Sequence, residues 1–292
     1  MAFFKKNLSV LLFIVLVALL TLLTGNKYLL GKNSVDKNSE RVILIAFGDT
    51  GTGENIQYTL AAHLVMECGQ DCKGIFLLGD VIYPNGVKAL SDFQFKTKFE
   101  APFANIYKPF YIVLGNHDYD GCEDCEVAYS SQSAKWHLPS KYYLQSYSGV
   151  VDIFVIDTND FSSEQKKWLI DGISRSKAKW KIVFGHHPLF SYDKRHAIAE
   201  NPFRGMIEES ICNNVDLYVS GHDHGLLDLG NYCNVHLMIS GGGGAPLGTF
   251  VDKVPFALPE FGFLKIDVSS TRLEADLINL DGKKVHAWVK VK

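Results

Sequence analysis

The sequence carries little net charge and has no long run of basic residues. Its 29 lysines and arginines nearly balance 32 aspartates and glutamates, for a formal net charge of −3, and no block of five or more Lys or Arg occurs. These absences argue against an electrostatic surface for nucleic acid. The 47% hydrophobic content excludes intrinsic disorder. Neither repeats nor an internal linker interrupt residues 41–292, which we expect to form one folded domain.

The N-terminal segment lacks a clear cleavage site. Lys5 and Lys6 precede an almost wholly apolar run, residues 8–23, whose length lies between that of a signal-peptide core and a membrane-spanning helix. No A-x-A site follows this run, and the two lysines predict an N-inside orientation. We expect residues 1–25 to be an uncleaved signal anchor in the membrane, with a cleaved signal peptide as the alternative, and residues 26–40 to be a linker. In either case we expect the domain to be exported to the periplasm, the extracellular space or an endomembrane lumen.

The cysteines are few but even in number. The six are Cys68, Cys72, Cys122, Cys125, Cys212 and Cys233. In an exported domain an even number predicts disulfides. The two close spacings favour local bridges, and Cys212 and Cys233 can join adjacent strand starts. A redox C-x-x-C site at Cys122 is the alternative, which its acidic neighbours disfavour because they would raise a thiol pKa.

Strands alternate with helices along most of the chain. We expect strands at residues 41–47, 74–78, 109–114, 150–156, 179–184, 215–219 and 234–239, and helices at 55–67, 91–104 and 162–173. The runs 261–268, 272–278 and 285–291 alternate with period two, with a hairpin turn at Asp281-Gly282. A parallel start and an antiparallel finish predict an α/β fold, a four-layer α/β/β/α sandwich of two mixed β-sheets with the helices outside.

Five loops at expected strand ends carry polar residues of one chemical kind. They are Gly48-Asp49-Thr50-Gly51, Gly79-Asp80-Val81-Ile82-Tyr83, Gly115-Asn116-His117-Asp118, Gly185-His186-His187-Pro188 and Gly221-His222-Asp223-His224. One Gly-Asp alone would indicate a turn, but an open α/β sheet presents its site beyond the carboxyl ends of its strands. Carboxylate, amide and imidazole donors suit a divalent or trivalent metal, and seven donors are too many for one ion. The pattern predicts a dinuclear metal site at the strand carboxyl ends.

This ordered set of motifs, from residue 41 to the C-terminus, resembles the calcineurin-like metallophosphoesterases. Tyr83, three residues after Asp80, resembles the purple acid phosphatases in their small, tartrate-resistant form. The resemblance implies two metal ions with the following ligands: for Fe(III), Asp49, Asp80, Tyr83 and His224; for Fe(II), Zn or Mn, Asp80, Asn116, His186 and His222. Asp80 would bridge the two ions. A free phenol titrates near ~10, so only a strongly Lewis-acidic ion would hold Tyr83 as phenolate in acid.

The same resemblance implies catalytic histidines. His117 would contact the phosphate and assist proton transfer to the leaving group. A second substrate-contacting histidine of the family lies downstream of the Gly-His-x-Pro motif, and His196 is the nearest candidate. Asp118 and His187 adjoin these residues and either orient a ligand or only pack. The glycine run 241–244 fits a turn better than a phosphate cradle, because no helix clearly follows it.

The implied function is that of an exported acid phosphatase. It would hydrolyse small phosphate monoesters with metal-bound hydroxide as the nucleophile, in a monomeric catalytic domain. A phosphodiesterase, nucleotidase or pyrophosphatase of the same superfamily is the alternative, because Thr50 stands where the mammalian-type enzymes usually carry Trp. A non-catalytic surface binding protein is a third hypothesis, which the loss of a ligand or of His117 would favour, and none is lost.

Overall fold

A computed structural model describes residues 41–147, 149–196, 201–251 and 253–292. The expected signal anchor at 1–25 and the linker at 26–40 lie outside the described residues. Within these described ranges no helix has the length and apolar character needed to cross a bilayer.

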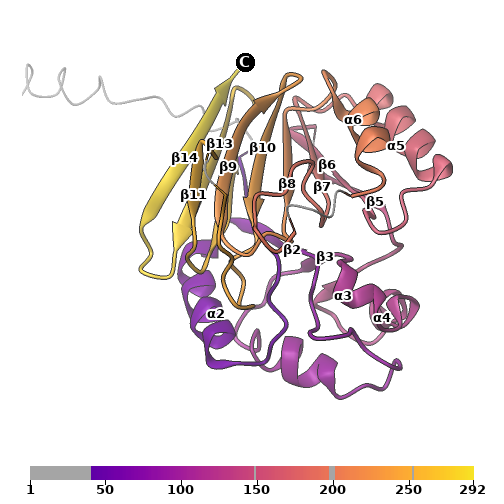
Figure 1. The fold of residues 1–292 in the computed structure, drawn as a ribbon, viewed down its shortest axis with the longest axis vertical. Helices are drawn as coiled ribbons and strands as arrows, with labels where there is room; N and C mark the ends of the chain where they lie inside the picture. The colour runs from indigo at the N-terminus through magenta and orange to yellow at the C-terminus, as the bar shows by residue number, and fades with distance from the viewer. Residues whose placement is uncertain (1–40, 148, 197–200, 252) are drawn as a thin grey trace, which may run out of the picture. The chain divides into compact units, whose positions relative to one another are not determined.

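The first sheet contains the chain's first strands and its last. Its order is β14-β13-β12-β1-β2-β3-β4 (Figure 1). In chain order the strands are β1 (Val42–Phe47), β2 (Cys72–Leu78), β3 (Phe110–Val113), β4 (Trp136–His137), β12 (Gly262–Val268), β13 (Arg272–Asn279) and β14 (Lys284–Val291). Strands β1 to β4 pair in parallel, and β12 adds to β1 in the antiparallel sense. The expected C-terminal strands and their hairpin turn at Asp281-Gly282 are therefore confirmed.

The second sheet is built from the middle of the chain. Its order is β11-β9-β10-β8-β7-β6-β5. In chain order the strands are β5 (Tyr143–Tyr147), β6 (Val151–Val155), β7 (Trp180–Phe184), β8 (Leu217–Ser220), β9 (Leu226–Tyr232), β10 (Val235–Ser240) and β11 (Phe256–Leu258). Strands β6, β7, β8 and β10 are parallel, whereas β5 on one side of them and β9 and β11 on the other pair antiparallel.

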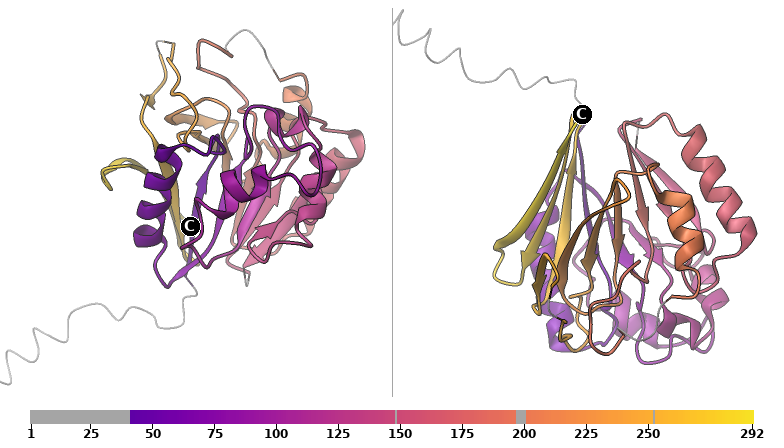
Figure 2. Two further views of the ribbon diagram at one scale, coloured as in Figure 1. Left: turned by 90° about the horizontal axis from the view of Figure 1, so that it is seen from below. Right: turned by 45° about the horizontal axis from the view of Figure 1, so that its top comes forward.

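The helices cover the outer faces of the two sheets. The main ones are α2 (Asn55–Cys68), α5 (Ser163–Arg175) and α6 (Arg204–Ile211), with short α3 (Asn116–Tyr119) and α4 (Glu123–Tyr129) beyond β3. Figure 2 shows α2 on one side of the paired sheets and α5 with α6 on the other. The predicted four-layer α/β/β/α sandwich is confirmed.

Alternation along β6 shows how the layers are held. Ile153 and Val155 belong to the hydrophobic cluster that fills the space between the sheets. Phe154 and Ile156 belong to a second cluster, which packs the sheet against α5 and α6. Successive side chains of a strand point to opposite faces, so a continuous apolar run is what a sheet buried on both faces requires.

Helix α5 begins where the sequence predicts, and Ser162 and Gln165 at its start form half of a capping box. The Ser162 hydroxyl accepts from the Gln165 N–H at 3.2 Å, which satisfies one of the free donors of the first turn. The Gln165 side chain does not return to Ser162. It accepts from the Asp157 N–H at 2.7 Å instead, and so fixes the loop that follows β6.

The prediction of an α-helix over residues 91–104 is wrong both in the length of the helix and in its type. The chain forms a π-helix, Lys96–Glu100, with turns beyond it. The Ala101 N–H donates to the carbonyl of Lys96, five residues earlier, which widens the turn. Lys98 lies on this wider turn and donates its ammonium hydrogen to the carbonyl of Tyr83. The segment therefore supports the loop after β2.

The six cysteines form the three predicted disulfides. Cys68 is bridged to Cys72, Cys122 to Cys125, and Cys212 to Cys233. The last bridge joins the end of α6, just before β8, to the turn between β9 and β10. It therefore ties together the beginnings of two adjacent parallel strands.

Removing the disulfide that closes the longest loop should destabilise the domain. Cys212 and Cys233 are 21 positions apart in the sequence. The double substitution Cys212→Ala/Cys233→Ala should therefore lower the free energy of unfolding by about 3 kcal/mol, because the unfolded chain regains loop entropy. Urea denaturation measures this loss, and Cys122→Ala/Cys125→Ala, which opens a much shorter loop, should lose less. Two or more free thiols in the denatured wild-type protein would contradict the disulfide assignment and favour the redox alternative.

Candidate metal centre

The five motif loops meet between the two sheets. Three of them follow the parallel strands β1, β2 and β3 of the first sheet, and two follow the parallel strands β7 and β8 of the second. Because parallel strands end at one edge of a sheet, their loops collect their side chains there. Every residue that the sequence predicts as a metal ligand lies in this cluster.

One donor group is centred on the phenol of Tyr83. Its oxygen lies 2.9 Å from Asp80 Oδ2 and 3.2 Å from Asp49 Oδ1. His224 Nε2 lies 3.2 Å from the same phenol oxygen. One ligand atom each from Asp49, Asp80 and His224 lies within 4.8 Å of the others. The four residues are those predicted for the first metal position.

A second donor group is centred on the amide of Asn116. Its Oδ1 lies 3.1 Å from His186 Nε2 and 3.1 Å from His222 Nδ1. Asp80 Oδ1 lies 3.4 Å from His186 Nε2. The other Asp80 oxygen belongs to the Tyr83 group, so this carboxylate lies between the two groups, where the sequence predicts a bridging ligand.

Backbone carbonyls fix two of the histidine rings. His186 donates its Nδ1–H to the carbonyl of Leu78 at 2.8 Å, and His224 donates its Nδ1–H to that of Pro246 at 2.8 Å. A carbonyl can only accept, so Nε2 of each ring keeps its lone pair and faces the centre. Such bonds commonly orient metal-binding histidines.

The pKa values of the histidines differ with their neighbours. Burial acts to lower the pKa of His186, but Asp80 and Asp49 raise it above its usual value. Burial lowers the pKa of His222 well below the usual range, and His186 lowers it further. His222 is therefore neutral, with a ring nitrogen available to a cation.

The backbone at three expected ligands has unusual dihedral angles. Asp49, Asp80 and His222 have φ of +61°, +52° and +68°, a region that costs free energy for residues other than glycine. A methyl group at Gly115 would overlap the Asp80 carboxylate, so the glycine that precedes Asn116 leaves the space that Asp80 occupies.

Asp118 joins two of the loops. Its buried carboxylate accepts from the Val81 N–H at 3.0 Å, the Ile82 N–H at 3.2 Å and the Gly115 N–H at 2.8 Å. Burial and the nearby Asp80 raise the pKa of Asp118 to about 7. The sequence leaves open whether Asp118 orients ligands or only packs, and these bonds show that it orients the loops that carry Tyr83 and Asn116.

The donor set fits cations. Asp49 is 0% and Asp80 1% exposed, and no described Lys or Arg lies within 4.0 Å of either carboxylate, whose charged neighbours are histidines. Burial raises the pKa of Tyr83 well above 10, and both carboxylates raise it further. Because each unpaired buried carboxylate costs several kcal/mol, these converging oxygen and nitrogen donors suit bound metal ions.

The two histidines predicted to be catalytic flank the donor groups. The His117 ring lies 4.5 Å from the Tyr83 ring between centroids, and its Nε2 lies 3.9 Å from Asp80 Oδ2. The His196 ring stacks on that of His222 at 4.0 Å. Both side chains are partly exposed, at 33% and 25%, so they line the solvent side of the centre.

Asp223 holds the loop that leads to His196. Its carboxylate accepts from the Ser191 hydroxyl and from the Tyr192 N–H, both at 2.6 Å, and from the Asp193 N–H at 3.1 Å. His196 Nδ1 lies 3.5 Å from the same carboxylate. The loop after β7 is thus held by the middle residue of the motif after β8, a long-range contact without a local sequence signal.

The glycine run and Thr50 form the support of the first loop. Gly243 N–H donates to the carbonyl of Gly48 at 3.0 Å, and Ala245 N–H donates to that of Asp49 at 2.8 Å. The run therefore packs against the Asp49 loop rather than forming a helix N-terminus. Thr50 is buried, so it does not stand at the entrance to the centre.

The sequence leaves open whether His187 orients a ligand or only packs. One ring nitrogen each from His186, His187 and His222 lies within 4.8 Å of the others. Burial lowers the pKa of His187 to about 3, and neighbouring histidines contribute to the decrease, so the ring is neutral. The Gly-His-His-Pro motif contains the signal for this residue, but one sequence does not tell which of two adjacent histidines turns inward.

Comparison with known proteins agrees with the geometry. The sequence model of the calcineurin-like phosphoesterases matches residues 19–226. The chain is 29% identical over 245 residues to purple acid phosphatase 7 of Arabidopsis thaliana, covering 73% of each chain. It is also 29% identical over 301 residues to tartrate-resistant acid phosphatase type 5 of Mus musculus, covering 82% of this chain and 88% of that protein.

Solved structures share the fold. GAP50, the anchor in the inner membrane complex of Plasmodium, superposes with a TM-score of 0.70 at 21% identity, covering 86% of this chain and 89% of that one. Purple acid phosphatase PPD1 from yellow lupin gives 0.68 at 18% identity, and the match covers 87% of this chain but about half (54%) of that longer protein. The chain therefore belongs to the calcineurin-like phosphoesterase family, in the branch of the purple acid phosphatases, whose members hydrolyse phosphoric monoesters.

Proposed function

We propose that this chain is an acid phosphatase that hydrolyses small phosphate monoesters at a dinuclear metal centre. The observation that carries the proposal is the position of Asp80, with one oxygen in the donor group of Tyr83 and the other beside His186. Asp49, Tyr83 and His224 would complete a position for Fe(III). Asn116, His186 and His222 would complete a position for Fe(II), Zn or Mn.

Two cations so held would clamp the attacking and leaving oxygens of an in-line displacement at phosphorus and lower the pKa of a bound water. The protein's own contribution is to fix their separation and orientation. Asp80 reaches both positions, and Asp118 holds the loops on either side of it. Because these bonds exist before substrate arrives, the site needs little reorganisation during the reaction.

His117 is proposed as the proton donor to the leaving group. Its Nδ1–H donates to the carbonyl of Pro84, so its Nε2, which lies on the side of Asp80, is the nitrogen that can exchange a proton. His196, stacked on His222, is proposed to contact the phosphate from the other side. The two imidazoles would then lie on the solvent side of the donors, where a substrate enters.

Export of this domain belongs to the same proposal. Three disulfides are typical of an oxidising compartment, and all six cysteines are paired. We infer that residues 1–25 direct the catalytic domain, residues 41–292, across a membrane and anchor it there, and that this domain acts as a monomer.

The proposal is tested by metal content and substrate class. The purified full chain should contain two metal ions per molecule by mass spectrometry, and should hydrolyse p-nitrophenyl phosphate faster than bis(p-nitrophenyl) phosphate. Asp80→Ala should lose both ions and measurable turnover, whereas Asp223→Ala, which removes a buried carboxylate of the 191–193 loop, should lose less. Faster diester hydrolysis would favour the phosphodiesterase alternative. Full metal content in the Asp80 variant would refute the bridging role.

Loss of His117 should impair chemistry and spare metal binding. His117→Ala should lower kcat by roughly 10²–10⁴-fold for alkyl phosphates, which are poor leaving groups, because general acid catalysis contributes about that much. The loss should be smaller for p-nitrophenyl phosphate, whose leaving group needs little protonation. His63→Ala, on α2, is the control and should behave as wild type. Equal kcat for wild type and His117→Ala on alkyl phosphates would remove the assignment.

Tyr83 should give the protein a colour. A phenolate bound to Fe(III) donates charge to the metal, so the oxidised protein should be violet to pink. Tyr83→Phe should bleach the visible band and leave the fold intact, because only one hydroxyl is removed. Activity should peak on the acid side of neutrality and decline as the pH rises. Absorption spectra and a pH–rate profile check both points, and a colourless, iron-free enzyme with full activity at alkaline pH would contradict them.

A further inference from the structure

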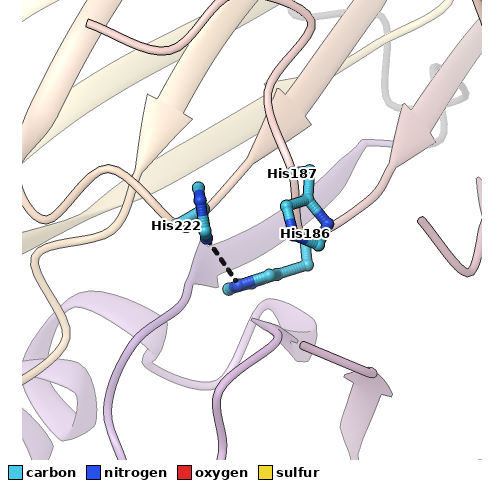
Figure 3. A group of neighbouring side chains, drawn as sticks. All are labelled: His186, His187 and His222. Atoms are coloured by element: carbon cyan, nitrogen blue, oxygen red, sulfur yellow. Dashed lines mark hydrogen bonds between the residues drawn. The ribbon is translucent and has the colours of Figure 1, made fainter. Parts of the chain in front are cut away.

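The loops after β7 and β8 bring three imidazole rings together. Figure 3 shows His186, His187 and His222 gathered where these loops meet, with a dashed line joining the rings of His186 and His222. The His187 ring lies 4.6 Å from that of His222 and 5.0 Å from that of His186. Only two of these rings belong to the ligand set that the sequence predicts.

Three polar contacts, made by two residues, hold His187. Its backbone N–H donates to the Thr158 hydroxyl at 3.0 Å, and the Tyr218 hydroxyl donates to its carbonyl at 2.6 Å. Its Nδ1 lies 2.8 Å from the same Thr158 oxygen. This contact and the two backbone bonds fix the orientation of the ring, which keeps one ring nitrogen within 4.8 Å of a ring nitrogen of His186 and of His222. Carbonyl groups likewise hold the rings of His186 and His224 in place.

No acidic partner accounts for the ring of His187. Of the carboxylates in the described residues, none lies within ion-pair distance of this ring, although Asp80 faces His186 and Asp49 faces His224. A histidine that only packed against His222 would need neither a fixed ring orientation nor a nitrogen within 4.8 Å of two expected ligand nitrogens. The geometry therefore indicates a role toward a bound cation.

We propose that His187 is a third imidazole ligand of the second metal position, an inference that rests on the proposed dinuclear centre. The position would then draw on His186, His187 and His222 besides Asn116 and the shared Asp80. Imidazole favours zinc and iron, whereas carboxylate and carbonyl oxygens favour manganese. The additional nitrogen should therefore bias this position toward zinc or iron and away from manganese.

Zinc K-edge X-ray absorption on the full chain, loaded with one iron and one zinc, tests the proposal. The wild-type spectrum should require three imidazoles around zinc, and that of His187→Phe should require two. The matched control is His196→Phe, since His196 also lies against the His222 ring, and it should keep three. Both substitutions retain an aromatic ring, so a loss of ring packing alone would not separate them.

Competition with a zinc chelator gives the second measurement. His187→Phe should weaken zinc binding by more than about 100-fold, beyond the 10–100-fold typical when a group that only orients a ligand is lost. If circular dichroism shows that the Phe variant is unfolded, His187→Gln replaces it. The glutamine retains a polar contact to Thr158, and the zinc spectrum should still require two imidazoles. Two imidazoles around zinc in the active wild type would overturn the inference and leave the phosphatase intact. A wild-type protein that binds no metal would instead refute the proposed dinuclear phosphatase, on which this inference rests.

Discussion

Burying a carboxylate in a protein costs several kcal/mol unless a partner of opposite charge or enough hydrogen-bond donors compensate for it. The centre buries Asp49 and Asp80, and their hydrogen-bond and ion-pair partners among the described residues are backbone N–H groups, a phenol and histidines. Three surrounding features make room for the buried carboxylates and hold them in place. They are the left-handed backbone at both aspartates, the absent side chain at Gly115, and the Asp118 carboxylate that holds neighbouring loops. Such an accumulation of strain and negative charge persists because the packed sheets on either side determine the positions of the loops.

The fold was readable from the sequence where the signal is local. Continuous apolar runs mark the parallel strands, because those strands are buried on both faces, and period-two alternation marks β12, β13 and β14. The pattern does not predict β5, β9 or α6. Strand β9 interrupts its apolar residues with Asp228 and Gly230 and gains its place by pairing with β10. The π-helix at Lys96–Glu100 contacts the Tyr83 loop through Lys98, a tertiary contact that helix propensity does not report.

In the candidate site too, the sequence predicts the features that have a local signal and misses those that depend on tertiary contacts. Each expected ligand lies within five residues of the end of a parallel strand, and these strand ends meet at one place in the fold, which brings all seven ligands together. His196 lies beside Asp223, 27 residues further along the chain, and its ring stacks on that of His222. The inward turn of His187 depends on Thr158 and Tyr218. These are tertiary contacts between side chains of different strand ends, and no spacing rule within one motif encodes them.

The division of the ligands between two sheets has a mechanical meaning. Asp49, Tyr83 and Asn116 belong to loops of the first sheet, while His186, His222 and His224 belong to loops of the second. Each cation would therefore cross-link the layers of the sandwich at one end. Binding to the native state alone stabilises it in proportion to the logarithm of free ion concentration, by about 2.7 kcal/mol at 100 times the Kd. The supply of metal would thus set the free energy needed to separate the two sheets. A chelator would lower that free energy by removing the ions.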